Sequence, residues 1–272
     1  MTNSIAEISG ASTIFAIGTN TTQAHPVLAL QAKKAAREGA NLIVANPKEI
    51  DLCRHATIHL QQRPGTDVAL VMGMIKVIVD AGLADMDFIN SRCENYDAFV
   101  DSLKEFDLAS VEKITGVPGE LISKAAKMYA SEGPSSILYC MGITQHCHGT
   151  DNVWSLSNLA LVTGNLGKAS AGVNPLRGQN NVQGSCDMGA LPDVYPGYQK
   201  VAKAENKHKF EDAWGVSLSD KEGLTHSEIF DDILDGEITA LYLIGENPYL
   251  SEANANHAIE SMNRLDFLVV QD

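Results

Sequence analysis

The chain has 272 residues, of which 44% are hydrophobic, and it carries a formal net charge of −14. This composition is sufficient for a sizeable core, and the length accommodates one large domain or two ordinary ones. Proteins that bind nucleic acid present a basic face to the phosphate backbone, so the acidic balance argues against a nucleic-acid partner.

The chain also lacks the features of a secreted or membrane-spanning protein. Its first twelve residues contain neither a basic lead nor an apolar signal-peptide core, and the longest apolar run, residues 68–75, ends at Lys76. A membrane span needs about 20 apolar residues, so the sequence predicts a cytoplasmic protein with no membrane span. The five cysteines are scattered without a CxxC pair, which argues against an iron–sulfur or zinc site within these residues.

Short apolar runs alternate with helical segments in the first part of the chain. The composition predicts strands at residues 12–17, 41–45 and 56–60, and a helix at residues 26–38 that ends at Gly39. Strands that alternate with helices predict a parallel sheet. Each of these strands ends in a polar turn, and ligands of open α/β sheets bind beyond the carboxyl ends of the strands. The loops after the strands are therefore expected to form a binding rim.

The middle of the chain is mostly helical. The three-to-four spacing of apolar residues and the terminal signals predict helices at residues 67–81, 85–90, 96–106, 118–131 and 151–163. One strand, at residues 136–140, interrupts them.

Composition changes beyond residue 200. Residues 200–220 are polar and weakly periodic, whereas a helix at 227–234 and strands at 240–244 and 267–270 are predicted. The last strand has no following helix, so we expect only part of a second α/β lobe and a chain that is a fragment. The predicted fold is α/β, a dinucleotide-binding parallel sheet with flanking helices plus part of a second α/β lobe. The expected domains are 1–170, the dinucleotide-binding domain, and 171–272, a glycine-rich active-site loop with part of the second domain.

Residues 164–190 form the most informative segment. Six glycines, four asparagines and two glutamines accompany a single arginine, Arg177. Glycine permits close approach of the main chain to a ligand, and amides supply donors and acceptors without net charge. The segment therefore suits phosphates and a polar heterocycle, and a solvent-exposed loop is the alternative.

Histidines offer a weaker signal. His146 and His148 flank Cys147, but no third or fourth ligand lies at a useful spacing, so a polar loop is predicted there and no metal site. His25 is expected at a helix start near the first loop, and residues 186–189 are predicted to form a turn that contains Asp187.

Several of these segments resemble motifs of a known enzyme family. Residues 164–199 resemble a segment of the catalytic subunits of molybdenum- or tungsten-dependent formate dehydrogenases, within the wider molybdopterin oxidoreductase family. Further motifs follow in family order: GTNTTQAHP at 18–26, VANPKEID at 44–51, RPGTDVAL at 63–70, ITGVP at 114–118, YCMGITQH at 139–146 and LIGENP at 243–248.

The resemblance implies a cofactor site for two molybdopterin guanine dinucleotides that hold one molybdenum or tungsten. For the first dinucleotide, it implies contacts from the strand-end loops, at Gly18, Asn20, Pro47, Lys48, Gly65, Asp67, Met141, Gly142 and Gln145. For the second, it implies Gly245, Glu246, Asn247 and the terminal Asp272.

Arg177 is the implied catalytic residue. By resemblance its guanidinium lies beside the metal and pairs with the formate carboxylate, while Gly178 and Gln179 contact the pterin. The implied reaction is oxidation of formate to carbon dioxide, with electrons passed to a 4Fe-4S cluster and on to electron-transfer subunits.

The resemblance also implies that this chain is incomplete as a catalyst. The metal's sulfur or selenium ligand and the cluster-binding domain are expected in the preceding part of a parent subunit, so these residues alone are expected to be inactive. Two alternatives stay open: another molybdopterin oxidoreductase, of the nitrate reductase type, or a non-catalytic nucleotide-binding module.

Overall fold

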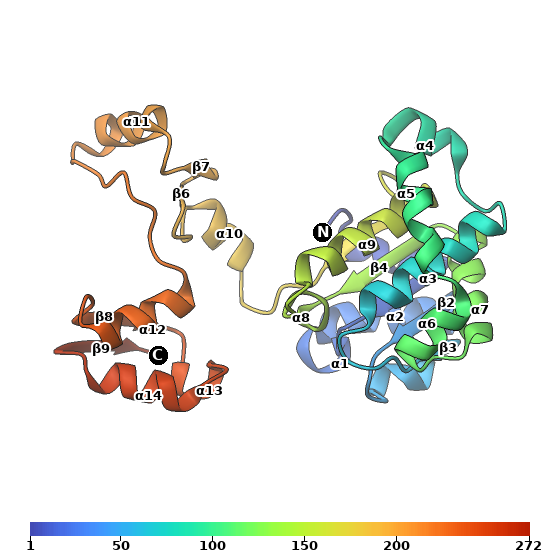
Figure 1. Ribbon diagram of the computed structural model, residues 1–272, viewed down its shortest axis with the longest axis horizontal. Coiled ribbons are helices and arrows are strands. Elements are labelled where there is room, and N and C mark those ends of the chain that lie inside the picture. Colours follow the sequence, from blue (N-terminus) through green and yellow to red (C-terminus); the bar gives the residue numbers. More distant parts are fainter. The chain divides into compact units, whose positions relative to one another are not determined.

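The computed structural model describes residues 1–272, and the chain forms two compact units, Met1–Gly178 and Gln179–Asp272 (Figure 1). The first unit contains a five-stranded sheet, and the second contains two separate two-stranded sheets.

The sheet of the first unit is entirely parallel. Its strands are β1 (Thr13–Ile17), β2 (Asn41–Ala45), β3 (Ile58–Leu60), β4 (Ser135–Tyr139) and β5 (Gly172–Pro175), in the order β3-β2-β1-β4-β5. At its centre, Phe15 of β1 lies opposite Ile43 of β2 and Ile137 of β4. The predicted α/β class is confirmed.

Helices cover both faces of this sheet (Figure 1). The α-helices are α1 (Thr21–Ala24), α2 (Pro26–Arg37), α3 (Asp67–Asp80), α4 (Met86–Arg92), α5 (Tyr96–Ser102), α6 (Leu108–Thr115), α7 (Gly119–Ser131), α8 (Met141–Thr144) and α9 (Gly149–Val162). Short 3₁₀ segments lie at η1 (Ala6–Gly10), η2 (Asp51–His55) and η3 (Leu103–Glu105).

Alternate residues of each strand supply two separate cores. Phe15 and Ile17 of β1 pack with α3, α7 and α9, whereas Ile14 and Ala16 pack with α2, η1 and η2 on the opposite face. Successive side chains of a strand point to opposite faces, so a strand covered on both faces is buried along its whole length. All five residues of β1 and of β4 are buried accordingly.

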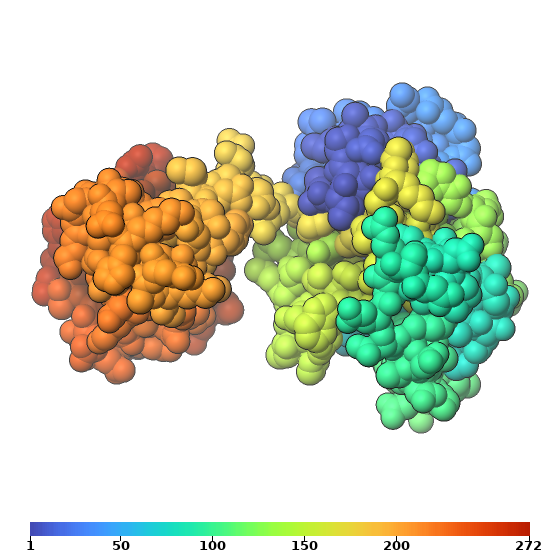
Figure 2. Space-filling view, turned by 90° about the horizontal axis from the view of Figure 1, so that it is seen from above, coloured from blue at the N-terminus to red at the C-terminus, as the bar shows by residue number.

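The N-terminal residues complete the first unit beside β5. The Thr2 main-chain N–H donates to the Val173 carbonyl at 3.2 Å, and Asn174 accepts from the Asn3 N–H at 3.2 Å. In Figure 2 the first residues, in dark blue, lie against the yellow segment that contains β5. The two sequence ends of this unit are therefore joined at one edge of the sheet.

Several elements differ from the sequence-based expectation. β5 and α6 were not predicted, because Gly-Val-Asn-Pro has no apolar run and α6 is only two turns long. Asp107 caps α6 by accepting from the Ala109 and Ser110 N–H groups, each at 3.0 Å. The predicted division at residue 170 stays a prediction, and β5, just beyond it, pairs with β4 in the first sheet.

The second unit contains α10 (Val182–Asp187), β6 (Val194–Tyr195), β7 (Gln199–Lys200), α11 (Ala204–Trp214), α12 (His226–Asp235), β8 (Ala240–Ile244), α13 (Pro248–Ser251), α14 (Ala255–Asn263) and β9 (Phe267–Gln271). The predicted turn at residues 186–189 overlaps the end of α10, where the Gly189 N–H donates to the Cys186 carbonyl at 3.0 Å. No helix was predicted for the polar stretch 200–220, which contains α11, because the charged side chains of α11 hide the helical period.

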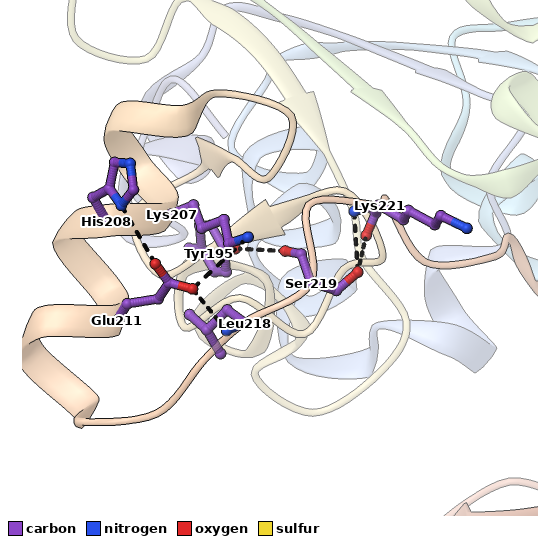
Figure 3. A network of polar contacts seen from close by, with 7 residues as sticks. All are labelled: Tyr195, Lys207, His208, Glu211, Leu218, Ser219 and Lys221. Atoms are coloured by element: carbon purple, nitrogen blue, oxygen red, sulfur yellow. Dashed lines mark hydrogen bonds and ion pairs between the residues drawn. The ribbon is translucent and has the colours of Figure 1, made fainter.

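Aromatic and polar contacts hold α11 to β6 and to the loop that follows the helix. Phe210 of α11 lies 4.8 Å from Tyr195 of β6 and 4.9 Å from Trp214 between ring centroids. Figure 3 shows the polar contacts with the following loop. Glu211 accepts from the Leu218 N–H at 2.9 Å, and this hydrogen bond lowers the pKa of the Glu211 carboxyl, with the charge of Lys207 acting in the same direction. The loop after α11 therefore folds back against the helix.

The last part of the second unit is a βαβ unit. β8 and β9 pair in parallel, and Phe230 and Ile233 of α12 pack with Ala258 of α14. A capping box between Thr225 and Glu228 begins α12. All five residues of β9 are exposed, in contrast to the buried strands of the first unit.

Candidate functional site

A pocket of about 220 Å³ lies at the carboxyl ends of the strands in the first unit. Its lining residues come from the loops after four strands: Gly18, Thr19, Asn20, Asn46, Pro47, Pro64, Asp67, Gly142 and His146. β1 leads to β2 on one side and has β4 on the other, so the strand order reverses here. This is where open α/β sheets bind ligands. We call it the rim pocket.

Two glycines allow the loops after β1 and β4 to meet. The Gly142 N–H donates to the Gly18 carbonyl at 3.0 Å, and the Gly18 N–H donates to the Ala45 carbonyl at 3.1 Å. A Cβ at Gly18 would lie 2.7 Å from the Gly142 carbonyl carbon, and Gly18 also has a φ of +56°. Side chains do not fit at that separation, so both positions require glycine.

The loop after β1 carries buried polar atoms without hydrogen-bond partners. These are Thr19 Oγ1, Asn20 Oδ1, Thr21 Oγ1, Thr22 Oγ1 and His25 Nδ1, joined from the loop after β3 by Gln62 Oε1. Buried polar groups are almost always paired in a folded protein. Of these residues, Thr19 and Asn20 line the rim pocket, so their unpartnered oxygens fit a polar ligand there.

The turn after β2 is held by side chains rather than by regular structure. Asn46 Oδ1 accepts from the Lys48 main-chain N–H at 2.9 Å, and Gln61 Nε2 donates to the Pro47 carbonyl at 2.9 Å. Pro47 lines the rim pocket, whereas Lys48 lies exposed in the same turn and outside the lining. A cation at this place favours an anionic ligand group.

Asp67 begins α3 and is buried at 4% exposure. Its Oδ1 accepts from Gln62 Nε2 at 3.0 Å. Gly65, which precedes it, is exposed, has a φ of +79° and does not line the rim pocket.

The loop after β4 forms the one-turn helix α8 instead of an irregular exit. Gly142 lines the rim pocket, while Met141 and Gln145 lie exposed at the two ends of this turn. His146 also lines the pocket, and its Nε2 lies 2.9 Å from the Gly142 carbonyl oxygen. Thr19, Asn46, Pro64 and His146 were not singled out as ligand residues from the sequence, although each is adjacent to a predicted one.

Arg177 follows β5 and is exposed. The Leu176 N–H donates to the Tyr139 carbonyl at 2.8 Å, and His25 Nε2 lies 2.8 Å from the Arg177 carbonyl oxygen. Burial raises the pKa of the Tyr139 phenol, and the charge of Arg177 partly offsets that rise. The main chain around Arg177 is thereby attached to the end of β4 and to the junction of α1 and α2, with Gly178 next in the chain.

The second unit has a turn of similar design after β8. The Gly245 N–H donates to the Gln271 carbonyl at 2.9 Å, and Gly245 has a φ of +62°. Ser251 Oγ donates to Glu246 at 2.7 Å, and Asn247 precedes α13. Asp272 follows β9 at the same end of this sheet, whereas Gln179 lies before α10.

The chain has neither a preformed metal cluster nor a membrane-spanning helix. No group of three or more His, Cys, Asp or Glu side chains in the structure is placed to hold a metal ion. None of the helices combines the length and apolar character needed to cross a membrane.

Comparison with known proteins identifies the family of the chain. Residues 1–272 match the molybdopterin oxidoreductase family over their entire length. The chain belongs to the molybdopterin oxidoreductase family. The resemblance drawn from the sequence motifs is confirmed.

Formate dehydrogenase subunits are among the relatives of this molybdopterin oxidoreductase chain. It is 46% identical to the F420-dependent formate dehydrogenase subunit alpha of Methanocaldococcus jannaschii over 100% of this chain and 40% of that protein. It is 42% identical to formate dehydrogenase H of Escherichia coli, over 100% of this chain and 38% of that protein. The chain therefore spans about two-fifths of the length of these relatives.

A solved structure has a similar fold. Acetylene hydratase from Pelobacter acetylenicus superposes with a TM-score of 0.73 at 21% sequence identity, over 98% of this chain and 41% of that one.

Proposed function

We propose that the chain is the central cofactor-binding part of a formate dehydrogenase catalytic subunit that acts in the cytoplasm. The cofactor is a molybdenum or tungsten bis(molybdopterin guanine dinucleotide), which supplies the two-electron redox chemistry for oxidising formate to carbon dioxide. The observation that carries the proposal is the rim pocket, with its glycine contact and unpartnered polar atoms, in a chain 42–46% identical to formate dehydrogenase subunits.

The chemistry of the rim pocket fits part of a guanine dinucleotide. Ligand pockets usually enclose about 300–1,000 Å³, so a pocket of about 220 Å³ accommodates one moiety of a longer ligand rather than the whole of it. Asp67, whose second carboxylate oxygen remains available, accepts from guanine or ribose donors, and the unpartnered oxygens of Thr19 and Asn20 take further donors.

The neighbouring loops serve the remaining moieties of the first dinucleotide. Lys48 offers its charge to a phosphate from the turn after β2, with Pro47 beside it, and Gly65 lets the main chain approach. Met141, Gly142 and Gln145 contact the same dinucleotide from α8. In the second unit, Gly245, Glu246, Asn247 and Asp272 contact the second dinucleotide from the equivalent end of the β8–β9 sheet.

Arg177 binds the substrate. A guanidinium offers two parallel N–H donors to a carboxylate, which is the only anionic group of formate. Gly178 and Gln179 contact the pterin next to it. A 4Fe-4S cluster in the remaining domains of the parent subunit would accept the electrons and pass them to electron-transfer subunits, so we expect these 272 residues alone to be inactive toward formate.

Formate-dependent dye reduction by the complete catalytic subunit tests the proposal. We expect Arg177→Lys to lower kcat/KM for formate by about 100-fold, because lysine replaces the bidentate pair with a point charge. The matched control is Arg54→Lys, at a guanidinium whose side chain is 80% exposed, and it should leave turnover unchanged. Turnover of nitrate instead of formate, or an Arg177→Lys enzyme equal to wild type, would contradict the proposal.

A further inference from the structure

His25 contacts the main chain of Arg177 across 152 residues of sequence. Its Nε2 lies 2.8 Å from the Arg177 carbonyl oxygen. A carbonyl oxygen only accepts hydrogen bonds, so in this contact Nε2 carries the proton and donates it. The other ring nitrogen, Nδ1, is buried and has no hydrogen-bond partner. The hydrogen bond to Arg177 therefore fixes both the tautomer and the orientation of the ring.

The base of the His25 side chain is fixed as well. The His25 N–H donates to the Thr21 carbonyl at the end of α1, and the His25 carbonyl accepts from the Ala29 N–H in the first turn of α2, each at 2.9 Å. Pro26, the first residue of α2, restricts the main chain further. His25 is thus a rigid junction between α1 and α2.

The segment that carries Arg177 is attached at successive residues. Cys140 Sγ donates to the Leu176 carbonyl at 2.8 Å, and the Leu176 N–H donates to the Tyr139 carbonyl. Gly178 follows and is exposed, and a Cβ at this glycine would have no atom within 4 Å. The Arg177 carbonyl, which His25 holds, therefore lies between the attached residue Leu176 and the conformationally free Gly178.

We propose that His25 is a positioning residue for Arg177. By holding the Arg177 carbonyl, it fixes the direction in which the guanidinium leaves the main chain. This inference rests on the proposed role of Arg177 in binding formate. Displacement of a substrate-positioning group by about 1 Å lowers kcat/KM by up to about 100-fold, so one hydrogen bond at this carbonyl has a measurable effect.

Kinetics of the complete catalytic subunit test the proposal. We expect His25→Ala to raise the KM for formate about tenfold while kcat changes by less than about threefold, because Arg177 contacts the carboxylate in both ground state and transition state. In His25→Gln, the side-chain amide reproduces the Nε2 donor, and the KM should return to within about threefold of wild type. The control is His55→Gln, at an exposed histidine of the same unit.

A second readout requires no catalytic activity. Trypsin cleaves after arginine, and the bond it would cleave at Arg177 contains the carbonyl that His25 holds. In the metal-free 272-residue chain, we expect His25→Ala to accelerate cleavage after Arg177 about tenfold and His25→Gln to restore the wild-type rate, since cleavage follows local opening. Cleavage after Arg54 should be equal in all variants and reports the integrity of the fold.

The outcomes separate this inference from the proposed function. If Arg177→Lys lowers kcat/KM for formate as expected but His25→Ala matches wild type in KM and in cleavage, His25 does not position Arg177 and the proposed function stands. If Arg177→Lys has no effect on formate turnover, the proposed function fails, and the cleavage rate after Arg177 alone decides whether His25 holds this segment. A His25→Gln variant that behaves like His25→Ala in both assays would also overturn the inference.

Discussion

The turns after β1 and β8 begin with the same local design and differ in their surroundings. Gly18 and Gly245 each follow a parallel strand, have φ of +56° and +62°, and donate to the last residue of the neighbouring strand. Each is followed two residues later by an asparagine that precedes a one-turn helix, Asn20 before α1 and Asn247 before α13. Only β1 has a second neighbour, β4, on its other side.

That difference shows what makes a pocket at a strand end. In the first unit the β4 loop approaches so closely that a Cβ at Gly18 would lie 2.7 Å from Gly142, whereas a Cβ at Gly245 would have no atom within 4 Å. The glycine turn depends on a few consecutive residues, so it can be recognised in the sequence. Closure of the pocket depends on the loop after the neighbouring strand, which is distant in the sequence.

Replacing the two glycines by alanine should separate these contributions. Gly245→Ala is expected to lower the local free energy of unfolding by about 1 kcal/mol, through the positive φ alone. Gly18→Ala adds overlap with the main chain at Gly142, for a total of about 3 kcal/mol. Hydrogen exchange of peptides covering β1 and β8 measures both values. Equal losses at the two positions would contradict the role assigned to the β4 loop.

A matched pair of valines tests the same contrast with a smaller effect. Val44 and Val270 occupy the fourth positions of β2 and β9, and their exposed fractions are 0% and 58%. We expect Val44→Ala to lower the free energy of unfolding by about 2 kcal/mol, because it removes two buried methyl groups and leaves a cavity. Val270→Ala should change it by less than about 0.5 kcal/mol. Urea unfolding, with hydrogen exchange as the readout, measures both changes in the free energy of unfolding. A larger loss for Val270→Ala than for Val44→Ala would contradict the comparison.

The sequence predicted the fold where the local signal was strong. β2 and β8 occupy the predicted residues because continuous apolar runs bounded by polar turns leave little choice. β5 escaped prediction because its identity depends on pairing with β4, where the buried Asn174 donates to Ser136 Oγ at 2.9 Å. The exposure of β9 was equally hidden, since an apolar run has the same sequence pattern whether or not it is covered.

The sequence also predicted part of the candidate site. The residues expected in the strand-end loops include Gly18, Asn20, Pro47, Asp67 and Gly142, which the structure brings together around the rim pocket. Their ligand contacts stay predictions. The contact between His25 and Arg177 could not be inferred from composition or spacing, because it joins residues that only the β1–β4–β5 arrangement makes neighbours.

Nucleotide and metal analysis of the purified complete subunit tests the central claim most directly. Acid hydrolysis should release guanine nucleotide together with a fluorescent pterin, at about two nucleotides for each molybdenum or tungsten atom, as a bis(dinucleotide) cofactor requires. Guanine nucleotide without either metal would instead identify a nucleotide-binding module and contradict the proposed redox function.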